Sequence, residues 1–318
     1  MLTNDTAKLV PRTEIDGKRW LDVEFPGLDI GVAEYPEGPT GCTVFHFPEV
    51  ASMHIDVRGG SPGINGEHLT VTNAICFAGG SLYGLEASTG VAAELFAKRG
   101  YSTKWMDIAL VSGAIIFDYG RHENAVYPDK ELGRAAVRAM KPGRFPLGPH
   151  GAGSSATAGH GATAELSGQG GAFGVFGPTH VAVFTVVNAY GAIVDRKGDV
   201  VRGNRDVATG KHRRAEDVVA QTGAYDPPAA RARGVTQNTN LTLLVTDQKL
   251  DRLQLRSVAR QVHASMARAI QPFNTRWDGD ILFAVTTQKT DNAALDEVSL
   301  GVVASELAWD AVLATFDT

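Results

Sequence analysis

The chain has 318 residues, of which 43% are hydrophobic, so it is long enough to bury a large core. Its net charge of −5, with no run of five or six like charges, argues against nucleic acid as a partner. The N-terminus lacks a signal-peptide pattern, and no apolar run approaches the ~18 residues of a membrane span. These features predict a soluble, cytoplasmic protein without a membrane partner.

The composition also argues against metal and cofactor chemistry. Cys42 and Cys76 lie in apolar stretches, which predicts buried free thiols rather than a disulfide or a metal site. The histidines show no metal-ligand spacing with a cysteine or a carboxylate. The small-residue tract from Gly151 to His160 lacks both the Lys-Ser/Thr of a P-loop and the glycine spacing of a dinucleotide fold. We therefore expect neither a metal nor a cofactor.

The first half of the chain alternates between strands and helices. The predicted order is three strands, a helix, a strand and a helix, over residues 30–34, 41–47, 51–57, 81–98, 109–117 and 129–140. Pro142 and Gly143 are predicted to end the last of these helices. Four glycine clusters are interpreted as tight turns between packed layers, or as loops that line a site with backbone N–H groups. They cover residues 58–63, 78–84, 148–153 and 168–174.

The second half carries longer apolar runs. Strands are predicted over residues 180–188, 192–195, 239–246 and 281–287, with a hairpin-like break at 189–191. Amphipathic helices are predicted over 255–270 and 295–316, the latter capped by Asp291 or Asn292. These strands do not alternate cleanly between apolar and polar residues, which indicates sheets that are covered on both faces. This periodicity fits an αββα sandwich of two sheets between helices, and it also fits a doubly wound parallel sheet.

The junction between Asn238 and Thr239 is the strongest candidate for chemistry. A Pro- and Arg-rich segment at residues 225–234 precedes it, and a buried strand begins at Thr239. A break in this peptide bond would give Thr239 a free α-amine with a pKa of about 7.7–8.0, suited to a base near neutral pH. A threonine paired with its own amine is an activated nucleophile. A threonine at the start of a strand is also an ordinary structural residue.

Further polar residues stand at strand ends. Asp278 and Asp280 flank Gly279 directly before the strand at 281. They form a solvated turn or, alternatively, a pair in which one carboxylate hydrogen-bonds the α-amine and the other holds the first in place. Asn188 ends an apolar strand, as a turn former or as a donor to an oxyanion. His160 is interpreted as a turn residue or a polar group of the site wall.

Long strings of the sequence resemble the nylon-oligomer endohydrolases, which act on 6-aminohexanoate oligomers and belong to the DmpA-like branch of N-terminal-nucleophile hydrolases. The resemblance runs from about Phe25 to Leu313. It includes Pro36-Glu-Gly-Pro-Thr-Gly41, Asn73-Ala-Ile-Cys-Phe-Ala-Gly-Gly80, Ile270-Gln-Pro-Phe273 and Asp278-Gly-Asp-Ile-Leu-Phe-Ala-Val-Thr-Thr287. The resemblance implies an αββα sandwich and one domain that cleaves itself into residues 1–238 and 239–318. It also implies a homotetramer of processed units.

The same resemblance implies roles for individual residues. Thr239 matches the nucleophile, Asp278 and Asp280 match the carboxylates of its relay, and Asn188 matches an asparagine near the oxyanion. Two positions depart from the family pattern. His160 stands where these enzymes carry a lysine, and Phe117 stands where they carry a tyrosine.

The sequence therefore predicts a self-cleaving amidohydrolase that hydrolyses internal amide bonds of linear 6-aminohexanoate oligomers through Thr239. Two other interpretations remain open. One is an aminopeptidase of the same fold, acting on short or β-amino peptides, which would need a carboxylate to bind the substrate ammonium. The other is a non-catalytic binding or scaffold protein that has lost activity through the changes at His160 and Phe117.

Overall fold

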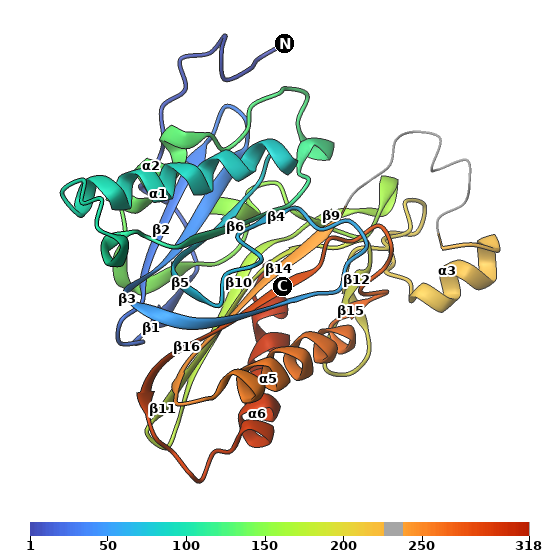
Figure 1. Cartoon of the computed structure of the whole chain (residues 1–318). Coiled ribbons are helices and arrows are strands. Elements are labelled where there is room, and N and C mark those ends of the chain that lie inside the picture. Colours follow the sequence, from blue (N-terminus) through green and yellow to red (C-terminus); the bar gives the residue numbers. More distant parts are fainter. Residues whose placement is uncertain (226–237, 318) are drawn as a thin grey trace.

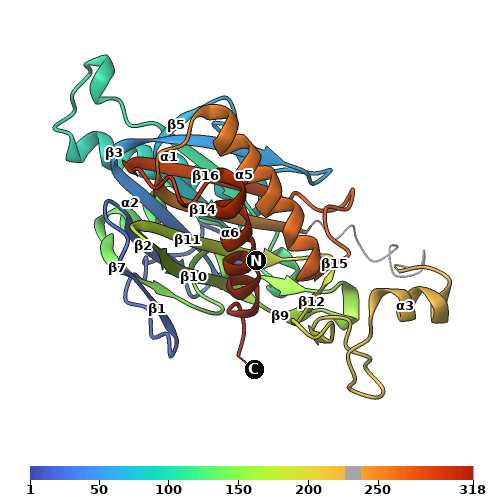
Figure 2. The same cartoon turned by 90° about the horizontal axis from the view of Figure 1, so that it is seen from below.

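The computed structural model describes residues 1–225 and 238–317, so most of the predicted Pro-rich segment at 225–234 lies outside the described residues. Two layers of strands lie between a pair of helices, α1 and α2, and a second pair, α5 and α6 (Figure 1). The view from below shows α5 and α6 crossing their face of the strands side by side (Figure 2). Among the described helices, none is both long and apolar enough to cross a membrane.

The layers are built from β1 (Trp20–Val23), β2 (Asp29–Tyr35), β3 (Thr40–Val57), β4 (Ile64–Asn65), β5 (Val71–Ala78), β6 (Val111–Ile115), β7 (Lys141–Pro146), β10 (Gly168–Phe176), β11 (Thr179–Asn188), β14 (Thr239–Gln248) and β16 (Ile281–Thr290). Smaller sheets contain β8 (Thr157–Ala158), β9 (Glu165–Leu166), β12 (Ala192–Val194), β13 (Val200–Arg202) and β15 (Ile270–Gln271). The α-helices are α1 (Glu86–Lys98), α2 (Lys130–Arg138), α3 (Ala215–Thr222), α5 (Arg252–Ser265) and α6 (Glu297–Leu313). Short 3-10 turns are η1 (Ser81–Leu85), η2 (Trp105–Asp107), η3 (Tyr119–Arg121), η4 (Gly151–Gly153), η5 (Gly161–Thr163) and η6 (Met266–Arg268).

Strand β3 belongs to both layers. Its first half pairs with β2 and β5, and its second half pairs with β16. The pairing with β5 shifts register between His46 and Ala51. The prediction of two separate strands over 41–47 and 51–57 was therefore wrong, because one long strand passes through this irregularity without a turn. Beyond β16 the order continues with β14, which is parallel to it, and then with antiparallel β11 and β10.

Three hydrophobic clusters define the four layers. The cluster between the sheets is rich in phenylalanine, and the ring of Phe45 lies 4.9–6.1 Å from the rings of Phe77, Phe145 and Phe184. A second cluster packs α1 and α2 on one sheet, and a third packs α5 and α6 on the other. The αββα sandwich is confirmed, and the antiparallel pairs in both layers exclude the doubly wound parallel sheet. Cys42 and Cys76 are buried free thiols, as predicted.

Other local predictions were wrong for identifiable reasons. Strands β11 and β12 do not form a hairpin, because β12 pairs with β13 and β15 in a separate sheet. The glycine cluster at 168–174 is strand β10 rather than a turn. A Cβ at Gly170 would lie 2.0 Å from the Ala311 carbonyl oxygen, so the absent side chain lets α6 pack against β10.

Two helix ends also differ from the prediction. The cap of α6 is Asp296, which accepts a hydrogen bond from the Ser299 N–H, and not Asp291 or Asn292. Helix α2 ends at Arg138, and Pro142 and Gly143 lie within strand β7 instead of closing the helix. Proline is tolerated there because that residue pairs only with Asp29 near the end of β2.

Candidate active site

Three neighbouring strands bring the candidate site residues to one end of a sheet. Asn188 ends β11 and lies opposite Thr239, the first residue of β14. Asn238 forms a parallel bridge with Asp278, which lies three residues before the start of β16. The order of β11, β14 and β16 thus brings together residues that are up to 90 positions apart in the sequence.

The peptide bond between Asn238 and Thr239 is buried, with only 5% and 3% of the two residues exposed. The Thr239 hydroxyl donates a hydrogen bond of 2.7 Å to the Asn238 carbonyl oxygen. The backbone N–H of Gly279 donates to the same oxygen, also at 2.7 Å. Two donors therefore polarise this carbonyl, and one of them is the hydroxyl of the candidate nucleophile.

Gly279 is a site residue that the sequence analysis treated only as part of a turn. A Cβ at this position would lie 2.7 Å from Thr239 Oγ1 and 2.6 Å from the Ser61 carbonyl oxygen. Glycine is therefore required for the close approach of the two strand ends. Its place between Asp278 and Asp280, before a strand parallel to that of Thr239, is the signal in the sequence.

Both carboxylates are buried and accept several hydrogen bonds. Asp278 accepts from the Tyr190 N–H at 3.2 Å, and from the N–H and hydroxyl of Thr275 at 3.0 and 2.5 Å. Burial raises the pKa of Asp278 above its ordinary value, although these donors oppose the shift. Thr275 is a further residue that the sequence analysis missed.

Asp280 lies deeper and is fully buried. Its Oδ1 accepts from the backbone and side-chain nitrogens of Asn240, each at 2.8 Å, and its Oδ2 accepts from the Asn274 N–H at 3.0 Å. Burial, and secondarily the charge of Asp278, raise the pKa of Asp280 to about 7. In the uncut chain, the hydrogen bonds recorded for the two carboxylates go to these donors and not to Thr239.

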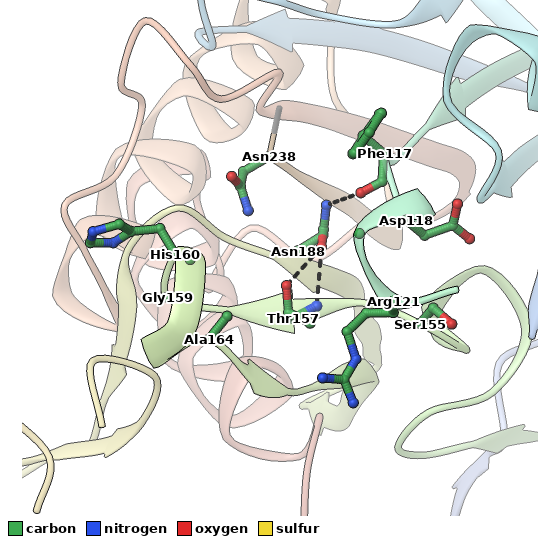
Figure 3. Close-up of a pocket in the computed structure, with 12 residues that line it drawn as sticks. Phe117, Asp118, Arg121, Ser155, Thr157, Gly159, His160, Ala164, Asn188 and Asn238 are labelled. Carbon is green, nitrogen blue, oxygen red and sulfur yellow. Dashed lines mark hydrogen bonds between the residues drawn. The ribbon is translucent and has the colours of Figure 1, made fainter. Parts of the chain in front are cut away.

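The Asn188 amide connects two segments of the site wall (Figure 3). Its Nδ2 donates to the Phe117 carbonyl oxygen at 2.9 Å, and its Oδ1 accepts from the Thr157 N–H at 3.0 Å. Asn188 thus lies opposite Thr239 at the end of β11. In the uncut chain its donor binds Phe117, and its role at an oxyanion stays a prediction.

Two cavities adjoin the Asn238–Thr239 bond. One, of about 210 Å³, is lined by Asn238, Asn188, Arg121 and His160, among others. The other, of about 220 Å³, is lined by Thr239 together with residues of the 61–63 and 81–82 segments. Phe117 lines both cavities. The site therefore offers space for a chain-like ligand next to each residue of this bond.

His160 belongs to an aromatic cluster in the wall of the first cavity. Its ring stacks on Tyr190 at a centroid distance of 5.0 Å and lies 4.7 Å from the ring of Tyr225. The Tyr225 hydroxyl donates to Asn204 Oδ1 at 2.9 Å, which holds the segment before the undescribed residues against this wall. The sequence analysis left His160 open as a turn residue or as a group of the site wall, and it did not identify the two tyrosines.

Comparison with known proteins identifies the family of this chain and several of its relatives. The family model "Peptidase family S58" matches residues 21–317. A 6-aminohexanoate-oligomer endohydrolase of Agromyces sp. (strain KY5R) is 42% identical over 322 residues, covering 98% of this chain and 89% of that protein. An uncharacterized aminopeptidase of Mycobacterium tuberculosis (strain ATCC 25618 / H37Rv) is 31% identical over 269 residues, covering 78% and 73%.

A solved structure extends the comparison to the fold. The L-aminopeptidase D-Ala-esterase/amidase of Ochrobactrum anthropi, described as a variant of the Ntn hydrolase fold, superposes with a TM-score of 0.63. The two chains share 15% identity over 95% of this chain and 88% of the other. The layered fold is therefore that of the N-terminal-nucleophile hydrolases. The chain belongs to peptidase family S58, and it is a hydrolase.

Proposed function

We propose that this protein is a self-cleaving amidohydrolase whose nucleophile is Thr239. The proposal rests on two hydrogen bonds to the Asn238 carbonyl oxygen. This oxygen accepts from the Thr239 hydroxyl and from the Gly279 N–H, each at 2.7 Å. A buried carbonyl in contact with a hydroxyl and a fixed backbone donor is prepared for attack. The cleavage products are residues 1–238 and 239–318 of a single domain.

Self-cleavage proceeds by an N→O acyl shift. Thr239 Oγ1 bonds to the Asn238 carbonyl carbon, and the carbonyl oxygen takes up negative charge that the Gly279 N–H stabilises. The hydroxyl proton leaves Oγ1 during this attack. The carbon–nitrogen bond then breaks, and the Thr239 nitrogen takes up that proton to become a free amine. Water hydrolyses the resulting ester and leaves a carboxylate on Asn238.

The mature enzyme uses the same threonine on an external amide. The α-amine of Thr239 accepts the hydroxyl proton as Oγ1 attacks, and it returns the proton to the leaving amine. Asp278 and Asp280 stabilise the ammonium form of the amine, and Asn188 with backbone N–H groups stabilises the oxyanion. Water then hydrolyses the acyl-enzyme. None of these steps needs a cofactor.

The proposed substrates are linear 6-aminohexanoate oligomers, cleaved at internal amide bonds. Support comes from the relative of that name at 42% identity and from the two cavities next to the bond, which suit an extended chain. An aminopeptidase is the second candidate, because a relative at 31% identity carries that name. Comparing hydrolysis of N-blocked and free oligomers separates the two, since an aminopeptidase requires the free ammonium.

A denaturing gel and an oligomer assay test the proposal. We expect wild type to give two bands and to release shorter oligomers, while Thr239→Ala stays one band and releases none. Thr239→Ser keeps a hydroxyl and should still split. An intact wild-type chain that degrades oligoamides would contradict the mechanism, and a split chain without amidase activity would support the non-catalytic alternative.

The proposal includes assembly into a tetramer of processed units. The loop around η2 supports it, because Trp105 and Met106 are 80% and 87% exposed and Tyr101 is 65% exposed. Large apolar side chains gathered on a surface are typical of protein contacts. Light scattering of the processed protein tests this part, and a monomeric mass would contradict it.

A further inference from the structure

The cavity beside Asn238 contains an exposed arginine that the proposed mechanism does not use. Arg121 is the last residue of η3 and lines this cavity together with Asn188 and Asn238. It approaches the cavity from a different element than His160 does (Figure 3). Within residues 1–225 and 238–317, the structure records no ion pair of the Arg121 guanidinium. A guanidinium at a cavity wall without a partner is available to an anion.

Asp118, the carboxylate that lines the same cavity, already accepts hydrogen bonds from other residues of the protein. Asp118 is only 2% exposed. Its Oδ2 accepts from the Thr40 hydroxyl at 2.6 Å, and its Oδ1 accepts from the Gly80 N–H at 2.8 Å. Asp118 therefore neither pairs with Arg121 nor offers an oxygen to a substrate ammonium. The other side chains that line this cavity bear no carboxylate, so its accessible charge is positive.

The cavity lies next to the bond that the proposed self-cleavage breaks. Asn238, which lines it, contributes the carbonyl group of that bond. The second cavity, which Thr239 lines, has no charged side chain among its described residues. Among the described residues that line these two cavities, Arg121 is the one arginine or lysine, so it is the partner they offer to a carboxylate ligand.

We infer that Arg121 binds the carboxylate of the substrate and makes the enzyme selective for oligoamides with a free acid end. The inference rests on the proposed function, because a linear 6-aminohexanoate oligomer ends in one carboxylate. Arginine binds a carboxylate through two parallel N–H···O bonds, which fixes both position and orientation.

A binding measurement tests the inference without any turnover. The processed protein is titrated in a calorimeter with 6-acetamidohexanoate and with its neutral counterpart, 6-acetamidohexanamide. We expect the acid to bind about tenfold more tightly than the amide, as a charge-assisted hydrogen bond provides. Arg121→Gln should abolish this preference and Arg121→Lys should retain part of it. Thermal unfolding checks that each variant is folded.

Arg205→Gln is the matched control, because it removes one positive charge from a neighbouring cavity that also contains Ala164. This control should keep the full preference for the acid. Equal binding of the two ligands by wild type, or an unchanged preference in Arg121→Gln, would overturn the inference. Selective binding of the acid by a protein that hydrolyses no oligoamide would instead refute the proposed function, and of the inference it would leave only the binding of a carboxylate by Arg121.

Discussion

Gly279 lies directly against Thr239, and a Cβ at residue 279 would approach Thr239 Oγ1 to 2.7 Å. The same atom would lie 2.6 Å from the backbone oxygen of Ser61, which cannot rotate away. Gly279→Ala should therefore displace the hydroxyl from the Asn238 carbonyl. We expect self-cleavage to slow by about 100-fold, the usual effect of a misplacement near 1 Å. A time course on denaturing gels measures the rate.

Gly120→Ala is the matched control, because Gly120 lines the adjacent cavity and a Cβ there meets nothing within 4 Å. It should split at the wild-type rate. Rapid processing of Gly279→Ala would show that the contact between Gly279 and Thr239 does not position the nucleophile.

The buried carboxyl of Asp280 should make the uncut protein less stable as the pH rises. Its pKa is about 7 in the folded chain, against an ordinary value of 3.8, so between these values the folded state binds more protons than the unfolded state. The free energy of unfolding therefore falls with rising pH in this window, by at most about 1.4 kcal/mol per pH unit. Urea unfolding of Thr239→Ala at pH 5 and pH 7 measures the change.

The double variant Thr239→Ala/Asp280→Asn isolates this contribution, because asparagine has nearly the same shape and does not titrate. We expect its stability to fall less than that of Thr239→Ala between the two pH values. An identical pH dependence in both proteins would show that Asp280 carries its charge throughout this range.

Asn188 should matter for stability as well as for catalysis. Its amide satisfies the Phe117 carbonyl and the Thr157 N–H, and Asn188 is itself only 2% exposed. Asn188→Ala leaves both backbone groups without this partner, which should cost about 2 kcal/mol of unfolding free energy. Chemical denaturation measures the loss. A variant with wild-type stability and no hydrolysis would assign Asn188 to catalysis alone.

The sequence predicted the layers of this fold better than the pairing of its strands. Apolar runs in β11, β14 and β16 revealed elements that are buried on both faces, and periodicity located α5 and α6. The continuity of β3 depends on the strands beside it. The residues between His46 and Ala51 resemble a break between two strands in the sequence, but in the sheet they form a register shift within one strand. Strand β10 was missed because four of its nine residues are glycines. Two of them, Gly170 and Gly174, face residues of α6.

In the candidate site as well, the sequence predicted some residues and missed others. Thr239, Asp278, Asp280 and Asn188 stand at strand ends, which the sequence marks by the change from polar to apolar residues. Their partners Asn240, Thr275 and Gly279 resemble ordinary turn or strand residues, and only the parallel pairing of β14 and β16 gives them a role. Arg121 carries no motif, and its availability depends on Asp118 being occupied by distant donors.

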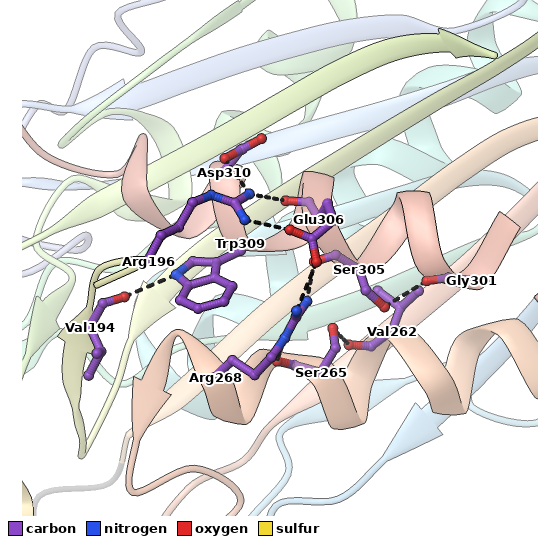
Figure 4. A network of polar contacts seen from close by, with 10 residues as sticks. All are labelled: Val194, Arg196, Val262, Ser265, Arg268, Gly301, Ser305, Glu306, Trp309 and Asp310. Carbon is purple, nitrogen blue, oxygen red and sulfur yellow. Dashed lines mark hydrogen bonds and ion pairs between the residues drawn. The ribbon is translucent and has the colours of Figure 1, made fainter. Parts of the chain in front are cut away.

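The two chains produced by cleavage should remain one folded unit. Strand β14 of residues 239–318 lies between β11 and β16, and β16 pairs with β3, so both chains share the sheet and its core. A polar network adds to this contact (Figure 4): Arg196 of the first chain donates to Asp310 at 2.8 Å and also pairs with Glu306. Trp309 lies 5.0 Å from the Arg196 guanidinium and donates to the Val194 carbonyl oxygen at 3.0 Å.

The shared core should therefore hold the chains together without this network. We expect the chains to co-elute in native gel filtration and to separate only in denaturant. Arg196→Ala removes ion pairs of a side chain that is 42% exposed, and it should lower stability by no more than about 1 kcal/mol. Trp309→Ala also removes packing against the core and should cost about 2 kcal/mol. Co-elution of the wild-type chains with separation of the Arg196→Ala chains in native buffer would show that surface ion pairs rather than the common sheet hold them. Separation of the wild-type chains would show that the common sheet does not hold them.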